Sequence, residues 1–205
     1  MRRLALLVLA ALLPACHSTT QIVVGILTNL AVPSQLTAVR LEASRNGVQV
    51  EQRLWTLSGQ KGVDFTLPGT YDLYSTRGGM PEVELELAGF VGETQVLTRH
   101  SQIQLVADEQ PFYRMTLVQS CEGVTCPAGS GCVEGVCRPD TVDPRVLPPY
   151  DSALALTVQC DSGSGFIDTS TCSTGTCAPL PITGPACAID EVCREGACDK
   201  KRLAP

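Results

Sequence analysis

The chain from about residue 20 to residue 119 alternates apolar and polar side chains with the period of β-strands. In Glu82–Leu87 the alternation is unbroken, which predicts one buried face and one acidic, solvated face formed by Glu82, Glu84 and Glu86. Ala38–Ala43 and Ser101–Val106 repeat this pattern. Six further strand-like runs are Gln21–Thr28, Val48–Leu57, Val63–Leu67, Tyr71–Thr76, Thr94–Arg99 and Phe112–Gln119.

Turn-forming residues separate these runs, and no helical period lies between them. The turn signals are Asn46-Gly47, Ser58-Gly59, Pro68-Gly69, Gly78-Gly79 and Gly92. Short strands at this spacing predict a mainly β fold, an antiparallel β-sandwich over residues 21–119. The segment Phe65–Tyr71 is similar to the L-P-G-x-Y turn and strand of carboxypeptidase-regulatory-like and transthyretin-like sandwiches. That resemblance implies an immunoglobulin- or transthyretin-like sandwich and transfers no activity.

The cysteines divide the chain into two parts near Ser120. None lies between His17 and Ser120, whereas ten of the eleven lie from Cys121 onward. Leu, Ile, Val and Phe make up 31 of residues 20–119 but only 16 of the 85 residues from 121 to 205. The first part can therefore bury a hydrophobic core, while the second needs disulfides to stay folded.

The cysteine-rich part contains two modules with even cysteine counts, for which we expect little regular structure. Residues 121–137 have the spacing C-x4-C-x5-C-x4-C, and the C-x5-C-x4-C register returns at the end of residues 160–198. The Pro-rich residues 138–159 are predicted to form a linker with a short strand, and residues 199–205 a basic tail. If each module is self-contained, three pairings remain open in the first and fifteen in the second. The predicted disulfide cysteines are Cys121, Cys126, Cys132, Cys137, Cys160, Cys172, Cys177, Cys187, Cys193 and Cys198.

The first sixteen residues have the order of an export signal. Basic Arg2-Arg3 is followed by the apolar run Leu4–Leu13, which is shorter than the roughly 20 residues needed to span a bilayer. The segment Leu13-Pro14-Ala15-Cys16 resembles the lipobox of bacterial lipoproteins, in which the signal is cut before the cysteine. The resemblance implies removal of residues 1–15 and attachment of diacylglycerol to the Cys16 sulfur and of an acyl chain such as palmitate to its amine.

The resemblance also bears on location. His17 stands where inner-membrane lipoproteins carry Asp, so we expect an outer-membrane protein of a bacterial cell envelope, with residues 16–20 as a lipidated tether. The alternative is ordinary signal cleavage that leaves Cys16 as a free thiol. Removing Cys16 from the count leaves ten cysteines, an even set, which favours lipidation.

The whole architecture up to Pro139 resembles predicted cysteine-rich lipoproteins of myxobacteria and related bacteria. The features that carry this resemblance are the lipobox, the sandwich opening Ile22–Leu27 and the C-x4-C-P-x4-C-x4-C tail. The family implies no enzymatic activity.

Charge and motif content argue against several functions. A net charge of −6 argues against nucleic-acid binding. The missing C-x2-C spacing argues against both structural zinc and thioredoxin-like chemistry. There is no nucleophile elbow, H-E-x-x-H, Walker A or dinucleotide fingerprint. We expect His100 to be a polar residue in a turn or at a strand end, and Trp55 to lie in the core.

These observations predict a lipid-anchored, non-enzymatic envelope protein with a binding, adhesion or assembly role. The covalent lipid on Cys16 is the only expected prosthetic group, and the expected partners are the membrane and an envelope protein or polysaccharide. One alternative is a disulfide-rich inhibitor of extracellular hydrolases. The other is an enzyme with a dispersed carboxylate site, drawn from Asp140, Asp143, Asp161 and Asp168.

Overall fold

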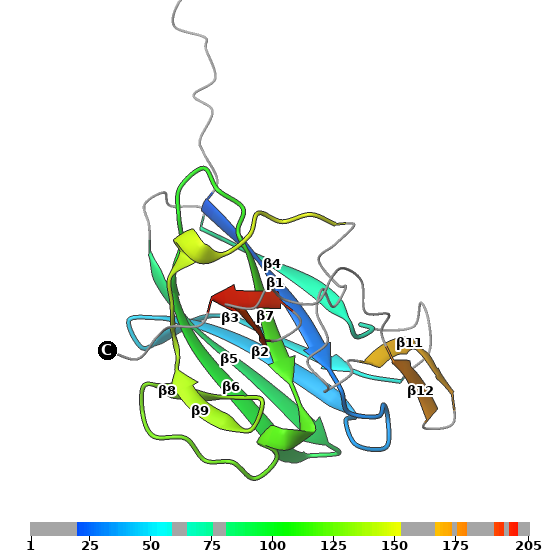
Figure 1. Ribbon diagram of the computed structural model, residues 1–205. Coiled ribbons are helices and arrows are strands. Elements are labelled where there is room, and N and C mark those ends of the chain that lie inside the picture. Colours follow the sequence, from blue (N-terminus) through cyan, green and yellow to red (C-terminus); the bar gives the residue numbers. More distant parts are fainter. Residues whose placement is uncertain are drawn as a thin grey trace, which may run out of the picture.

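The structure is a computed structural model that describes residues 20–58, 65–75 and 81–152, and the backbone of four short strands between 167 and 200. Over these residues the chain is mainly β, as predicted (Figure 1). The first seven strands are β1 (Thr20–Thr28), β2 (Ala38–Arg45), β3 (Val48–Thr56), β4 (Gly69–Ser75), β5 (Glu82–Val91), β6 (Thr94–Gln104) and β7 (Phe112–Leu117).

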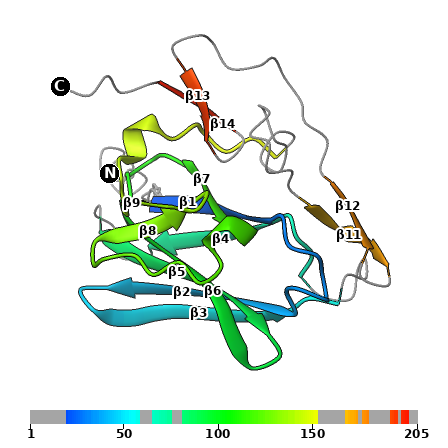
Figure 2. The same cartoon turned by 60° about the horizontal axis from the view of Figure 1, so that its bottom comes forward.

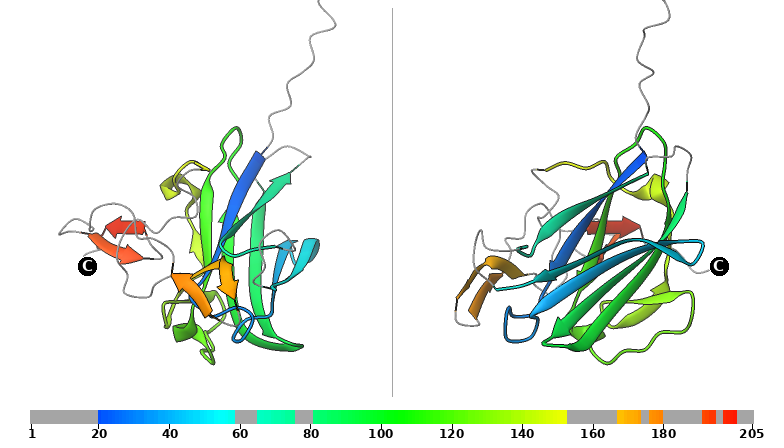
Figure 3. Two further views of the ribbon diagram at one scale, coloured as in Figure 1. Left: turned by 90° about the vertical axis from the view of Figure 1, so that its right-hand side faces the viewer. Right: turned by 180° about the vertical axis from the view of Figure 1, so that it is seen from behind.

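These seven strands, together with the short strand β10, form the two layers of a sandwich. A small sheet has the order β4–β1–β7, and a large sheet has the order β10–β6–β5–β2–β3, where β10 is Thr141–Val142 (Figures 2 and 3). Most pairs are antiparallel, as expected, but β1 pairs with β7 and β10 pairs with β6 in parallel. The predicted sandwich is confirmed, with a mixed rather than a purely antiparallel pairing.

Burial explains the sequence patterns of the strands. β2 and β5 alternate buried and more exposed residues because only their inner faces pack against the small sheet. β1 instead has both faces buried, with Val23 and Leu27 on one and Ile22 and Ile26 on the other. The unbroken apolar run of β1 is thus that of a strand covered on both sides.

Two predicted strand boundaries differ in the structure. The runs Thr94–Arg99 and Ser101–Val106 form one continuous strand, β6, so His100 lies in the middle of a strand and not in a turn or at a strand end. Of the run Val63–Leu67, residues 65–67 are described and are not in a strand. Trp55 is partly buried, and its ring stacks on Phe65 with centroids 4.4 Å apart.

The first cysteine module packs directly on the sandwich. Its disulfides are Cys121–Cys132 and Cys126–Cys137, and Cys121 and Cys132 are buried within the same core as the two sheets. β8 (Ser130–Val133) and β9 (Val136–Pro139) form a hairpin that lies beside β6 (Figure 2). β10 follows this hairpin. Two short 3-10 helices flank the module, Gln119–Cys121 at its start and Pro144–Val146 after β10. Within the stretch predicted as a linker with a short strand, Thr141–Val142 forms β10 of the large sheet.

The second cysteine module is described only as two hairpins. These are β11 (Ile167–Ser173) with β12 (Thr176–Pro179), and β13 (Glu191–Arg194) with β14 (Ala197–Lys200). The regular structure described in the two modules consists of short hairpins. Residues 1–19, with the predicted signal and Cys16, lie outside the described residues, as do Cys160 and Cys187. In the described part of the chain, no helix has the length and apolarity to cross a bilayer.

Candidate functional site

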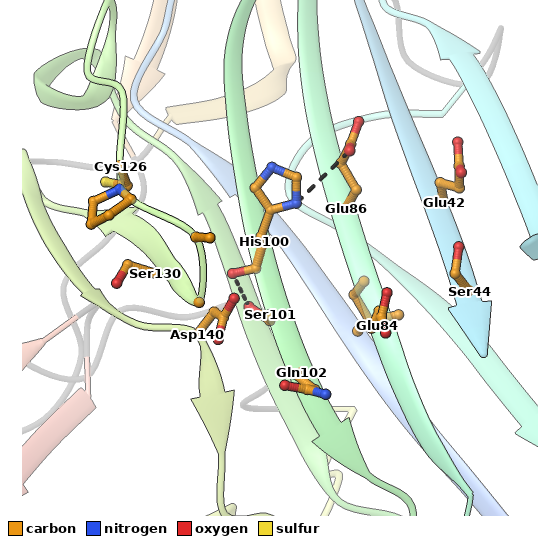
Figure 4. A pocket seen from close by; sticks show the side chains of 14 residues that line it. Glu42, Ser44, Glu84, Glu86, His100, Ser101, Gln102, Cys126, Ser130 and Asp140 are labelled. Atoms are coloured by element: carbon orange, nitrogen blue, oxygen red, sulfur yellow. Dashed lines mark hydrogen bonds and ion pairs between the residues drawn. The ribbon is translucent and has the colours of Figure 1, made fainter. Parts of the chain in front are cut away.

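A groove of about 450 Å³ lies between the outer face of the large sheet and the loop Cys126–Ser130 of the first disulfide module (Figure 4). We call it the acidic groove. Its polar lining residues are Glu42, Ser44, Glu84, Glu86, His100, Ser101, Gln102, Ser130 and Asp140.

The floor of the acidic groove is set by the register of three strands. Glu86 of β5 lies opposite Glu42 of β2 on one side and opposite His100 of β6 on the other. The next outward-facing row places Glu84 between Ser44 and Gln102. Because side chains alternate along a strand, these two rows share one face of the sheet.

Glu86 is the most connected carboxylate of the groove. One of its oxygens accepts a hydrogen bond from the Arg40 guanidinium at 2.9 Å, and the other lies 3.8 Å from His100 Nδ1. Figure 4 shows the imidazole of His100 directed toward Glu86. The Glu86 and Arg40 side chains are about one-third exposed, so the ion pair is partly screened by solvent.

The opposite wall is held by covalent and backbone contacts. The Cys126–Cys137 disulfide fixes the start of the loop, and the Ser130 amide donates to the Pro127 carbonyl. Asp140 is fixed by its backbone, since its amide donates to Gly129 and its carbonyl accepts from the Gln102 amide at 2.8 Å. The groove therefore lies between two rigid surfaces, the paired strands of the sheet and the disulfide-linked loop.

Gly131 allows this wall to approach β6. A Cβ atom on Gly131 would lie 2.7 Å from the His100 carbonyl oxygen, which is closer than real Cβ atoms come to backbone atoms. The hairpin can pack beside His100 only because this position carries no side chain.

The charge of the acidic groove is negative. Four carboxylates line it, from Glu42, Glu84, Glu86 and Asp140, and of these only Glu86 has an arginine within ion-pair distance among the described residues. Carboxylates that line a concave site attract cationic groups and repel anionic ones. The groove suits a positively charged partner group.

The geometry around His100 lacks the parts of a nucleophilic site among the described residues. No serine hydroxyl there hydrogen-bonds to its imidazole; the buried Ser101 hydroxyl instead bonds to the His100 carbonyl and to the Tyr113 hydroxyl. In the same described part, no group of three or more His, Cys, Asp or Glu side chains is arranged to hold a metal ion.

The structure separates the acidic residues that the sequence suggested. It brings Glu84, Glu86 and Asp140 to one groove, whereas Glu82 does not line it. Asp143 lies outside the groove beside Arg145, whose guanidinium and amide hydrogen bonds hold the pKa of that carboxyl below its usual range. Asp161 lies outside the described residues, and only the backbone of Asp168 is described, in β11.

Sequence reasoning missed Glu42 and Ser44 as partners of the acidic row on β5. The signal was available in β2, where Arg40, Glu42 and Ser44 occupy the outward positions between buried residues. The pattern within β2 does not show that β2 pairs with β5, because strand pairing is not contained in any local pattern.

A second groove opens at one end of the sandwich, between the edge strands β3 and β4. We call it the open-end groove; its volume is about 770 Å³. Its floor consists of the buried residues Ala43, Leu73, Val83 and Leu105, and its rim carries Val48, Val50 and Tyr74.

Tyr71 connects the two edge strands beside the open-end groove. Its hydroxyl accepts a hydrogen bond from Arg53 at 2.9 Å and donates to Glu51 at 3.0 Å. Partial burial is the main cause that raises the pKa of the Tyr71 hydroxyl above its ordinary value, and the bond to Glu51 adds to it. The hydrogen bond to Tyr71, followed by the nearby charges, raises the pKa of Arg53.

Comparisons with known proteins identify no relative. The chain matches no protein-family model, and neither the curated proteins nor the solved structures contain a match to it.

Proposed function

We propose that this protein is a lipid-anchored, non-enzymatic cell-envelope protein that binds a positively charged segment of an envelope partner in the acidic groove. The observation that carries the binding role is the construction of the groove from two rigid walls, one a paired sheet and one a disulfide-linked loop. A preorganised site loses little conformational entropy when a partner binds.

The anchoring part of the proposal is supported by the lipobox-like segment ending at Cys16 and by the even number of cysteines that remain. Lipidation predicts that the protein extracted from membranes carries acyl mass on a chain beginning at Cys16. A Cys16→Ala variant should leave the membrane fraction. Recovery of that variant in the membrane fraction, at the level of the unchanged protein, would contradict the anchor.

The binding part is tested by neutralising one groove carboxylate. Glu84→Gln removes a charge from the groove without disturbing the Glu86–Arg40 ion pair. We expect the partner captured from envelopes by amine-to-amine crosslinking to fall by about two- to fivefold, because an ion pair to an exposed carboxylate such as Glu84 is worth about 0.5–1 kcal/mol.

Glu82→Gln is the matched control, since Glu82 lies on the same face of the same strand but outside the groove. It should leave capture unchanged. Equal capture by the wild type and both variants would exclude the acidic groove as the contact surface.

A further inference from the structure

The open-end groove lies where the folded part of the chain begins. Thr20, the first residue of β1, pairs with Ser75, the last residue of β4, and Ser75 lines the groove. Figure 3 shows the start of β1 beside the end of β4 at this end of the sandwich. The turn of the β2–β3 hairpin, with Arg45 and Val48 paired across it, lies at the same groove.

The rim of this groove gathers exposed apolar side chains. Among the described residues, seven large apolar side chains are exposed, and three of them, Val48, Val50 and Tyr74, line the open-end groove at 65%, 58% and 66% exposure. Exposed apolar residues gathered around one concavity mark a contact surface, whereas single ones scattered over a protein do not.

The length of chain before β1 limits what can cover this rim. Cys16 precedes Thr20 by four residues, which span at most about 14 Å when fully extended. A lipid on Cys16 would therefore place the bilayer surface within that distance of Thr20. The rim beside Thr20 is then among the parts of the sandwich nearest the membrane.

We propose that the open-end groove is the membrane-facing surface of the protein, with Val48, Val50 and Tyr74 in the interfacial layer of the bilayer. This inference rests on the lipidation of Cys16 proposed above. Tyr is favoured at the headgroup level because its ring is apolar and its hydroxyl is polar. A short tether holds the rim at the surface, so a small apolar area suffices to orient the sandwich.

The charges at this end define the lipid. Arg45 and Arg53 on the lining are balanced by Glu51 and Asp72, and Arg53 is already bound to Glu51 at 2.9 Å. The contact is therefore apolar in origin and needs no anionic headgroup. Phosphatidylcholine is the lipid to use in the test.

The test places an indole on the rim of the full-length, lipidated protein. Tyr74→Trp is made in a Trp55→Phe background, so that one indole reports, and the protein is reconstituted in phosphatidylcholine vesicles with brominated acyl chains. Because the ring would lie at the boundary of headgroups and acyl chains, we expect roughly twofold quenching of its fluorescence.

Leu54→Trp in the same background is the matched control. Leu54 is also 66% exposed and belongs to β3, but it does not line the groove. Its indole should keep the intensity that it has in vesicles without bromine.

Each other outcome is distinct. Protein that floats with the vesicles but shows equal quenching at both positions, or none, overturns the membrane-facing surface and leaves the anchor intact. A blue shift of the Tyr74→Trp indole without quenching shows that a second copy or the protein's own acyl chain covers the groove, and also overturns it. Failure to float removes the anchor and this inference together.

Hydrogen exchange provides a measurement without substitutions on the rim. Relative to Cys16→Ala protein in solution, the lipidated protein in vesicles should show slower amide exchange in residues 45–50 and 71–75. Exchange in residues 97–102 of β6 should be unchanged. If residues 45–50 and 71–75 exchange at the same rates in both samples, the proposal is contradicted, even if the indole variants fail to fold.

Discussion

Gly131 determines, at the scale of single residues, how closely the disulfide module approaches the sheet. It is a buried position in β8, and the nearest atom to a Cβ there would be a backbone oxygen of β6, which cannot rotate away. A side chain at this position would push the hairpin off His100 and widen the acidic groove.

We therefore predict that Gly131→Ala lowers the free energy of unfolding by about 1–3 kcal/mol, the usual cost of an inserted group in a packed site. Urea denaturation followed by Trp55 fluorescence measures this change. Val136→Ala in the same hairpin, where the side chain is half exposed, should change it by less than about 0.5 kcal/mol. Equal stability of the two variants would mean that the hairpin is not seated on β6.

Residue-level reasoning succeeded for side chains whose environment follows from the strand period. The inward Leu85 and Leu87 and the outward Glu84 and Glu86 lie on the faces that alternation predicted. It failed for His100, because a polar residue between two apolar runs has the same local pattern in a turn as on the wet face of a long strand.

The disulfide-linked hairpin is the feature that recurs at the scale of elements. In β8–β9 the two cysteines lie directly opposite each other, yet each bonds to a cysteine eleven positions earlier. Opposite residues of a hairpin point to the same face, so the preceding loop lies over that face. In β13–β14, Cys193 lies opposite Cys198 in the same register.

This equivalence predicts the pairing of the second module. Cys187 precedes Cys198 by eleven positions, as Cys126 precedes Cys137, so we expect a Cys187–Cys198 disulfide. In the first module the first cysteine bonds to the third and the second to the fourth. The same order in the last four cysteines of the second module gives Cys177–Cys193, which leaves Cys160 to pair with Cys172. Each bond would form as two thiols pass two electrons and two protons to an oxidised disulfide donor.

Mass spectrometry of the non-reduced protein, digested after alkylation of free thiols, identifies the linked peptides. Cys121–Cys132 and Cys126–Cys137 in the same digest are the internal controls. A Cys193–Cys198 crosslink in place of the predicted pair would show that the second hairpin is closed differently from the first.

In the molecule as a whole, the sandwich and the first disulfide module share one hydrophobic core. Cys121 and Cys132 are buried in it, Val142 and Leu147 pack against it, and β10 extends the large sheet along β6. The sequence divides near Ser120 in composition, but the packing continues across that point.

Truncation measures how much the first disulfide module stabilises the sandwich. We expect the chain 20–151, produced under oxidising conditions, to unfold cooperatively. The chain 20–119 loses a disulfide-linked module worth about 2–4 kcal/mol per bond, and should melt at least about 10 °C lower. Scanning calorimetry makes the comparison, and equal melting temperatures would show that the sandwich needs nothing beyond residue 119.

Local periodicity and backbone preference predict most of the strands, their buried faces, the turns at Asn46-Gly47 and Gly92 and the β-class of the fold, and the structure confirms these. The parallel pairing of β1 with β7, the two disulfide pairs of the first module and the meeting of Glu42 with Glu86 and Asp140 are seen only in the folded molecule. These depend on contacts between residues far apart in the chain. Such contacts are selected by burial of the common core, which no local pattern records.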